Sequence, residues 1–129
     1  LKTVEDIMLT DKAIPFVDEN MKMKKALKIL SLKKLGFLLV RNKKKITCGI
    51  ITDGELRRFS QKNQNLHDIK VKEVMTKNPI GIHKDELAAK ALSIMNNKKI
   101  TSLCVYGSKN KLKTIGVLHI HNILQSNIS

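Results

Sequence analysis

The chain has 129 residues, a formal net charge of +14 and 42% hydrophobic residues. This length and composition fit one compact domain, or two small halves packed together, and exclude a disordered chain. No apolar run reaches the roughly 18–20 residues that a membrane-spanning helix needs. No secretory signal pattern opens the chain, so we expect a cytoplasmic protein without a membrane partner. Because it begins at Leu1 rather than Met, it looks like a piece of a longer protein.

The positive charge raises the question of nucleic-acid binding. Of the 25 basic residues 22 are Lys, and the three arginines are Arg41, Arg57 and Arg58. Base readout favours Arg, and single-strand binding favours exposed aromatic side chains, which make up only 3% of this chain. The lysines are spread along the whole sequence and indicate a general lysine bias. We therefore expect no nucleic-acid partner, and keep a basic nucleic-acid binder as a competing hypothesis.

A sequence repeat runs through the chain. Val4–Met8 returns as Val71–Met75, and Gly49 returns as Gly116, in both cases 67 positions later. A period of this length indicates a duplicated small domain rather than a solenoid. We place the two domains at residues 1–65 and 66–129.

In chain order, both halves show the same elements. A short amphipathic turn leads to a proline-bearing strand, an amphipathic helix, two apolar runs separated by polar turn residues, and a second helix. The expected strands are at 14–17, 37–40 and 46–51 in the first half and at 78–82, 103–106 and 112–118 in the second. The expected helical core positions are Met23, Ala26, Leu27, Leu30, Ala88, Ala91, Leu92 and Met95. The pattern predicts an α+β fold of two pseudo-symmetric β-α-β-β-α units.

The most informative stretch runs from Gly49 to Arg58, where an apolar strand passes into a charged helix. Thr52 and Glu55 form a Thr-x-x-Glu capping box, which accounts for both residues without a ligand. The same geometry suits a nucleotide: a helix N-terminus and the Thr52 hydroxyl bind phosphate, and Glu55 accepts hydrogen bonds from ribose hydroxyls. Arg57 and Arg58 would supply countercharge, and the apolar strands a slot for a flat base. Both interpretations stay open at this point.

The repeated unit resembles the CBS domain, which occurs as tandem pairs. In that family the second hairpin strand ends in Gly-h-h-Thr/Ser-x-x-Asp, where h is apolar, and the Thr/Ser and Asp contact phosphate and ribose of adenosine nucleotides. The first repeat matches with Glu in place of Asp; the second has His in place of Thr/Ser and Asn in place of Asp. The resemblance implies nucleotide-binding candidates at Ile14, Phe37, Thr52, Asp53, Glu55 and Arg58, and at His119 and Asn122.

The resemblance extends to the C-terminal CBS pair of bacterial D-arabinose 5-phosphate isomerases. The segments that carry it are Ile14–Val17, Leu35–Gly36, Thr52–Arg58, Val74–Thr76, Ile100–Ser102 and Gly116–Leu124. Such enzymes interconvert ribulose 5-phosphate and arabinose 5-phosphate for the Kdo sugar of lipopolysaccharide or capsule. Their catalysis lies in an N-terminal sugar-isomerase domain that this chain lacks. The resemblance implies a regulatory or assembly module with no catalytic residue of its own.

The same resemblance implies the partners. We expect the sugar-isomerase domain of the same protein, a second copy bound through the CBS helices, and a regulatory ligand that is an adenine nucleotide or the pathway product CMP-Kdo. The alternative is a nucleotide-sensing CBS pair from another host protein, such as a transporter or a nucleotide enzyme. The sequence upstream of Leu1 would separate these hypotheses.

His119 and His121 form the remaining pair of candidate ligands. On a strand such a spacing directs both side chains to one face and could hold a metal. At the start of a helix it is more typical of a polar pair, so we expect no metal. Alternatively, His119 takes the place of the phosphate-contacting hydroxyl in the second repeat.

Overall fold

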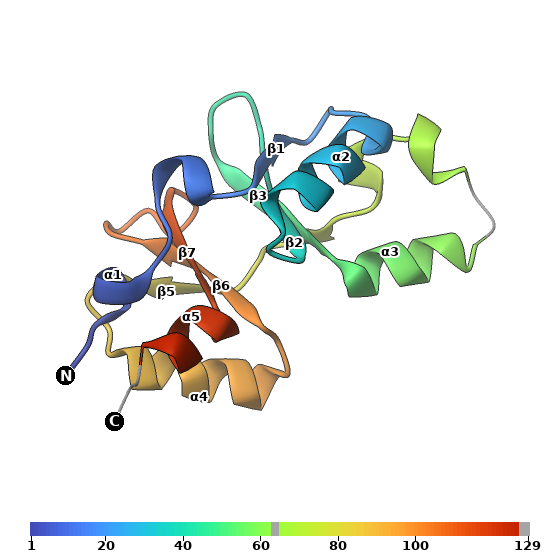
Figure 1. Ribbon diagram of the computed structural model, residues 1–129. Coiled ribbons are helices and arrows are strands. Elements are labelled where there is room, and N and C mark those ends of the chain that lie inside the picture. The colour runs from blue at the N-terminus through green and yellow to red at the C-terminus, as the bar shows by residue number, and fades with distance from the viewer. Residues whose placement is uncertain (63–64, 127–129) are drawn as a thin grey trace. The chain divides into compact units, whose positions relative to one another are not determined.

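The computed structural model describes residues 1–62 and 65–126. The chain forms two compact units (Figure 1). Unit 1 contains Leu1–Ile14 and Ile80–Ser129, and unit 2 contains Pro15–Pro79. The first 14 residues therefore fold with the second repeat, so the compact units divide the chain differently from the sequence repeat. The division at residues 65 and 66 stays a prediction about the repeat.

Unit 2 is built on a four-stranded sheet in the order β1-β2-β3-β4. Strand β1 runs parallel to β2, and the pairs β2–β3 and β3–β4 are antiparallel. Its elements are β1 (Phe16–Asp18), α2 (Met23–Lys33), β2 (Phe37–Arg41), β3 (Thr47–Thr52), α3 (Asp53–Ser60), the 3-10 helices Leu66–Asp68 and Val71–Glu73, and β4 (Thr76–Lys77). The parallel β1–β2 pair is possible because α2 supplies the crossover.

Unit 1 repeats this order on a three-stranded sheet, β5-β6-β7, with β5 parallel to β6 and β6 antiparallel to β7. Its elements are α1 (Val4–Ile7), a 3-10 helix (Asp11–Ala13), β5 (Gly81–His83), α4 (Ala88–Lys98), β6 (Ser102–Tyr106), β7 (Thr114–His119) and α5 (Ile120–Gln125). Leu9 bridges Val117, in the place that β4 takes beside β3 in unit 2. The expected α+β fold of two β-α-β-β-α units is confirmed.

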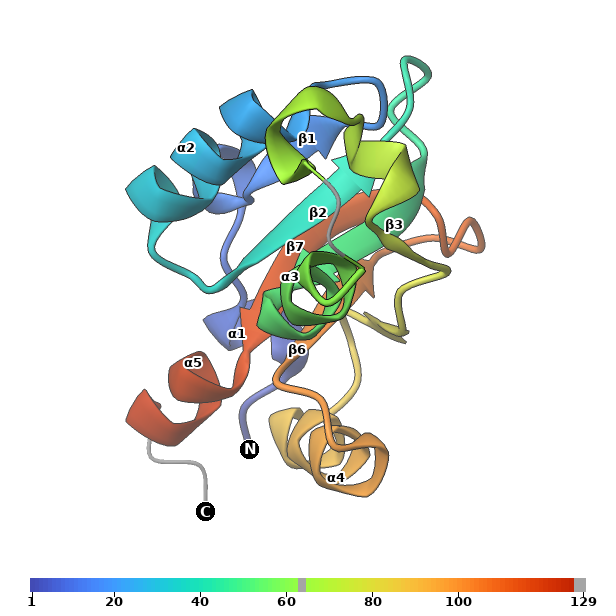
Figure 2. The same ribbon diagram turned by 90° about the vertical axis from the view of Figure 1, so that its right-hand side faces the viewer.

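Each unit has its own apolar core. Helix α2 turns Met23 and Ala26 inward in unit 2, and α4 turns Ala91 and Met95 inward in unit 1, as the helical spacing predicts. Leu27 and Leu30 are half-buried at the core edge. In unit 1, α4 packs on β6 and α5 on β7, and the two helices touch (Figures 1 and 2). Among the described residues, no helix is long and apolar enough to cross a bilayer.

The segment that begins each repeat, here called its leading segment, packs in the core of the other repeat. The leading segments are Val4–Met8 and Val71–Thr76. Val4, from the first repeat, is buried in unit 1, while Val71 and Val74, from the second repeat, are buried in unit 2. The next methionine of each leading segment lies on the motif glycine of the other repeat. A Cβ atom at Gly49 would lie 2.3 Å from the sulfur of Met75, and one at Gly116 would lie 2.5 Å from the sulfur of Met8. Both motif glycines therefore make room for a neighbouring methionine.

We predict that Gly49→Ala lowers the free energy of unfolding by about 1–3 kcal/mol, because the new methyl group overlaps three side-chain atoms of Met75. Gly54→Ala is the matched control, since its Cβ would meet no atom closer than 3.5 Å. Urea unfolding of both variants measures the difference. In a double-mutant cycle, Gly49→Ala should lower the free energy of unfolding much less when Met75→Ala is already present. If the two losses of stability are additive, the contact with Met75 is not the cause.

Candidate functional site

The start of α3 is held by the capping box that the sequence predicts. Thr52 Oγ1 accepts a hydrogen bond from the Gly54 amide at 3.3 Å. Glu55 Oε1 in turn accepts hydrogen bonds from the Thr52 amide and from the Thr52 hydroxyl, both at 2.7 Å. Two amide donors at the helix start are satisfied in this way, so Thr52 and Glu55 have a structural role whether or not a ligand binds.

The second oxygen of Glu55 is held by Arg58, one helical turn further along α3. The Arg58 guanidinium donates to Glu55 Oε2 in an i,i+3 ion pair. The Glu55 side chain is 9% exposed, whereas that of Arg58 is 65% exposed. A nearly buried carboxylate is thus paired with a side chain that lies mostly in solvent.

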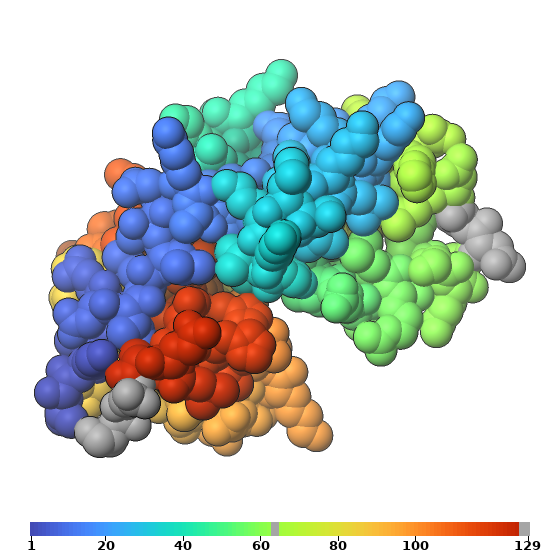
Figure 3. Space-filling view, viewed as in Figure 1, coloured from blue at the N-terminus to red at the C-terminus, as the bar shows by residue number. Residues whose placement is uncertain are grey.

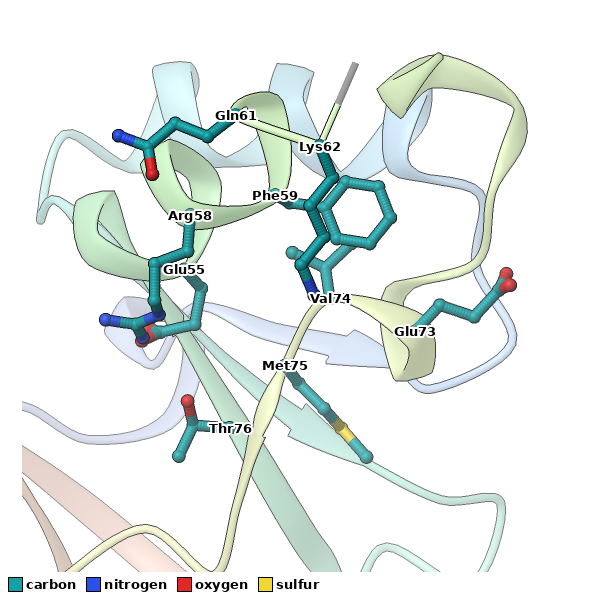
Figure 4. A pocket seen from close by; sticks show the side chains of 9 residues that line it. All are labelled: Glu55, Arg58, Phe59, Gln61, Lys62, Glu73, Val74, Met75 and Thr76. Carbon is teal, nitrogen blue, oxygen red and sulfur yellow. The ribbon is translucent and has the colours of Figure 1, made fainter. Parts of the chain in front are cut away.

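This cluster opens on a cavity of about 430 Å³ within unit 2, here called the α3 hollow. Small-molecule sites typically occupy about 300–1,000 Å³. The hollow is lined by Glu55, Arg58, Phe59, Gln61, Lys62, Glu73, Val74, Met75 and Thr76 (Figure 4). One side is the inner face of α3, and the other is the leading segment of the second repeat. Its middle is apolar, and its ends carry charged groups.

Two carboxylates, Glu55 and Glu73, and two cations, Arg58 and Lys62, line the α3 hollow. In Figure 4 the ammonium of Lys62 lies between the Arg58–Glu55 pair and Glu73. Among the described residues, no ion pair involves Lys62. Residues 15–79 carry 16 of the 25 Lys and Arg residues and 6 of the 11 Asp and Glu residues. Several of these lysines are exposed on α2, whose side chains form part of the face seen in Figure 3.

The structure brings part of the predicted site together. Phe37 is 2% exposed and is the register partner of Thr52 across β2 and β3, so it lies beside the capping box. Asp53 is exposed in the first turn of α3, where a negative charge complements the helix dipole. Ile14 is 6% exposed and belongs to unit 1, whereas the α3 cluster belongs to unit 2.

The second repeat uses the same cap with different chemistry. His119 Nδ1 accepts from the His121 amide at 3.2 Å, and Asn122 Oδ1 accepts from the His119 amide at 2.9 Å. Because Nδ1 is an acceptor, the neutral tautomer of His119 carries its proton on Nε2. Burial, and secondarily the neighbouring His121, lower the pKa of His119. Within residues 1–62 and 65–126, no three His, Cys, Asp or Glu side chains converge as metal ligands would.

The sequence interpretation missed most of the lining of the α3 hollow. Of the predicted site residues, only Glu55 and Arg58 contribute to it. Phe59 lies further along the same helix, Lys62 lies in the turn that follows it, and Met75 and Thr76 come from the start of the second repeat. The Val4–Met8 repeat at Val71–Met75 was visible in the sequence, but nothing there showed that this copy lies beside α3.

The chain belongs to the CBS domain family, whose sequence profile matches residues 4–62 and again residues 71–128. Among curated relatives, it is 34% identical over 128 residues to the arabinose 5-phosphate isomerase KdsD of Salmonella typhi. That match covers 99% of this chain and 38% of KdsD. The chain therefore spans well under half the length of this relative.

Solved CBS structures share the fold. The chain superposes on CBSX2, a protein of Arabidopsis thaliana solved with AMP, with a TM-score of 0.84 at 23% identity, over 98% of this chain and 96% of that one. It also superposes on the CBS pair of protein MJ0100, solved with 5'-methylthioadenosine and S-adenosyl-L-methionine, with a TM-score of 0.81 at 21% identity, over 98% and 95% of the two chains. These similarities confirm the tandem CBS fold that the sequence predicts.

We predict that the protein loses stability as the pH falls below about 6.5, the ordinary pKa of histidine. Since the pKa of His119 is lowered by folding, the unfolded chain binds more protons in the window between its ordinary and its lowered pKa. The contribution of His119 to the free energy of unfolding is therefore complete above that window and is lost within it as the pH falls. Thermal unfolding between pH 5 and pH 8 measures this.

The matched variants for this prediction are His119→Ser and His67→Ser. Serine can cap α5 in place of histidine, so His119→Ser should flatten the pH dependence while keeping the helix start. His67 lies exposed in a 3-10 turn, and its replacement controls for the loss of any histidine. An unchanged pH slope in His119→Ser would assign the effect to another group.

Proposed function

We propose that this chain is the regulatory CBS pair of an arabinose 5-phosphate isomerase and that the start of α3, with the α3 hollow, binds an adenosine nucleotide. The match to KdsD along 99% of the chain supports the host. The observation that carries the ligand is the hydrogen-bonded cluster of Thr52, Glu55 and Arg58, of which Glu55 and Arg58 line the α3 hollow. It gathers a hydroxyl, a carboxylate and a guanidinium beside a cavity large enough for a nucleotide.

Each group suits one part of an adenosine nucleotide. The carboxylate of Glu55 accepts hydrogen bonds from ribose hydroxyls, and Arg58 and Lys62 offer positive charge to a phosphate. The amides and the dipole at the start of α3 add to this charge. AMP, methylthioadenosine and S-adenosylmethionine, the molecules found with CBSX2 and MJ0100, share the adenosine moiety. Adenosine nucleotides are therefore the first ligands to test for binding.

CMP-Kdo is the second candidate, since it carries the same ribose and a phosphate but a different base. The groups described so far bind ribose and phosphate and do not distinguish the bases. Calorimetric titration of the chain with AMP, S-adenosylmethionine, CMP and CMP-Kdo compares them directly. We expect AMP to bind; tight binding of CMP-Kdo alone would assign the site to feedback by the pathway product.

We predict that Thr52→Val weakens AMP binding about tenfold, whereas Thr52→Ser leaves it nearly unchanged. Valine keeps the shape of threonine and loses the hydroxyl, and serine keeps the hydroxyl. Thr52→Val should also cost about 1 kcal/mol of stability through the lost N-cap. The titration is therefore run well below the melting temperature of each variant. Equal AMP affinities in the two variants would remove Thr52 from the ligand site.

The host is tested on the full-length protein that contains this chain. We expect it to convert ribulose 5-phosphate into arabinose 5-phosphate, with a rate or an affinity that changes when the ligand of the CBS pair is added. An upstream region with membrane spans, or a full-length protein without this isomerase activity, would favour the nucleotide-sensing pair of another host. The proposed second copy, bound through the CBS helices, is tested by sedimentation of the isolated chain.

A further inference from the structure

Both carboxylate oxygens of Glu55 already have hydrogen-bond partners in the structure. Oε1 already accepts two hydrogen bonds from Thr52, and Oε2 is paired with Arg58. A ribose hydroxyl that binds Glu55 must therefore approach Oε2, where Arg58 lies. Because the Glu55 side chain is only 9% exposed, the Arg58 guanidinium restricts the approach of a ligand to this oxygen.

Of the two partners, Arg58 is the one able to move. Glu55 is 9% exposed and anchored by both bonds to Thr52, whereas Arg58 is 65% exposed on a long side chain. The guanidinium also lines the α3 hollow, so it can turn from Glu55 toward a group inside the cavity. A phosphate there would offer it a charge-assisted, bidentate contact in exchange for Glu55.

The second repeat supports a link between the two charges. At the positions 67 residues after Glu55 and Arg58, the chain has Asn122 and Gln125. Asn122 keeps the capping bond to the backbone of His119 and needs no countercharge. The arginine is thus absent where the carboxylate is absent, although the cap is retained. Arg58 therefore belongs functionally with the charge of Glu55 rather than with the helix cap.

We propose that Arg58 is a phosphate-operated latch on Glu55, an inference that rests on the proposed adenosine-nucleotide site. Without a phosphate, the ion pair covers Oε2 and opposes ribose binding. With a phosphate in the α3 hollow, Arg58 moves to the phosphate and leaves Oε2 to the ribose. The latch makes the site selective for phosphorylated nucleosides over free nucleosides, and Lys62 holds the phosphate in the hollow together with Arg58.

The test compares AMP with adenosine on Arg58→Met, which keeps the aliphatic stem and removes the guanidinium. AMP should bind about tenfold more weakly, because a charged contact to phosphate is lost. Adenosine should bind several-fold more tightly, because Oε2 is uncovered and a nearly buried carboxylate then gains the ribose hydroxyl as a donor. The two ligands therefore respond in opposite directions to one substitution.

Two further variants isolate the cause. Arg57→Met removes the same charge from the neighbouring position of α3 but leaves the Glu55 pair and the lining of the hollow intact. It should change both affinities less than about twofold. Lys62→Met should weaken AMP and leave adenosine unchanged, because Lys62 contacts phosphate and does not cover Glu55. Circular dichroism and thermal unfolding confirm that each variant is folded.

The outcomes separate this inference from the proposed function. If neither AMP nor adenosine binds to the wild-type chain or to Arg58→Met, the adenosine site itself is wrong. If AMP binds the wild type but Arg58→Met weakens both ligands, or leaves adenosine unchanged, the site stands and the latch is overturned. Opposite shifts for the two ligands, absent from Arg57→Met, establish the latch.

Discussion

The packing of each methionine on the glycine of the other repeat is the constraint on which the structure depends. Met75 lies on Gly49 in unit 2, and Met8 lies on Gly116 in unit 1. A side chain at either glycine would overlap the methionine that lies on it, so the methionine or its segment would have to shift. The exchange also builds the candidate site, because Met75 and Thr76 form one side of the α3 hollow only while that segment lies beside β3. The contacts that hold this segment in unit 2 therefore also form part of the lining of the candidate site.

The two repeats show how one local structure supports different chemistry. Both α3 and α5 begin with a capping box, so the backbone geometry at the helix start is the same. In unit 2 the box contains a charged carboxylate that requires a cation, and Arg58 supplies it. In unit 1 the box contains an imidazole and an amide, and both accept hydrogen bonds from backbone amides. The first repeat therefore has the charges that an anionic ligand with hydroxyl groups can use.

A large part of the fold could be predicted from local patterns. The apolar spacing from Met23 to Leu30 identifies α2 because a helix repeats every 3.6 residues, and Thr52 with Glu55 identifies the start of α3 because a cap needs a side-chain acceptor there. Both signals lie within a few residues of sequence. The Arg58–Glu55 pair is also local, at a spacing of three residues. The sequence does not show how exposed the two side chains are, however, and only the folded chain shows that Glu55 is 9% exposed and Arg58 65% exposed.

The sequence by itself determined the duplication, the order of elements, the family resemblance and the capping role of Thr52 and Glu55. Each of these follows from residue types at short or periodic spacings. Only the tertiary structure decided that the first 14 residues fold with the second repeat. It also decided that Lys62 and Thr76 share a cavity with Glu55. Thr76 is placed there by the pairing of β4 with β3, and local sequence patterns carry no record of which distant segment a strand pairs with.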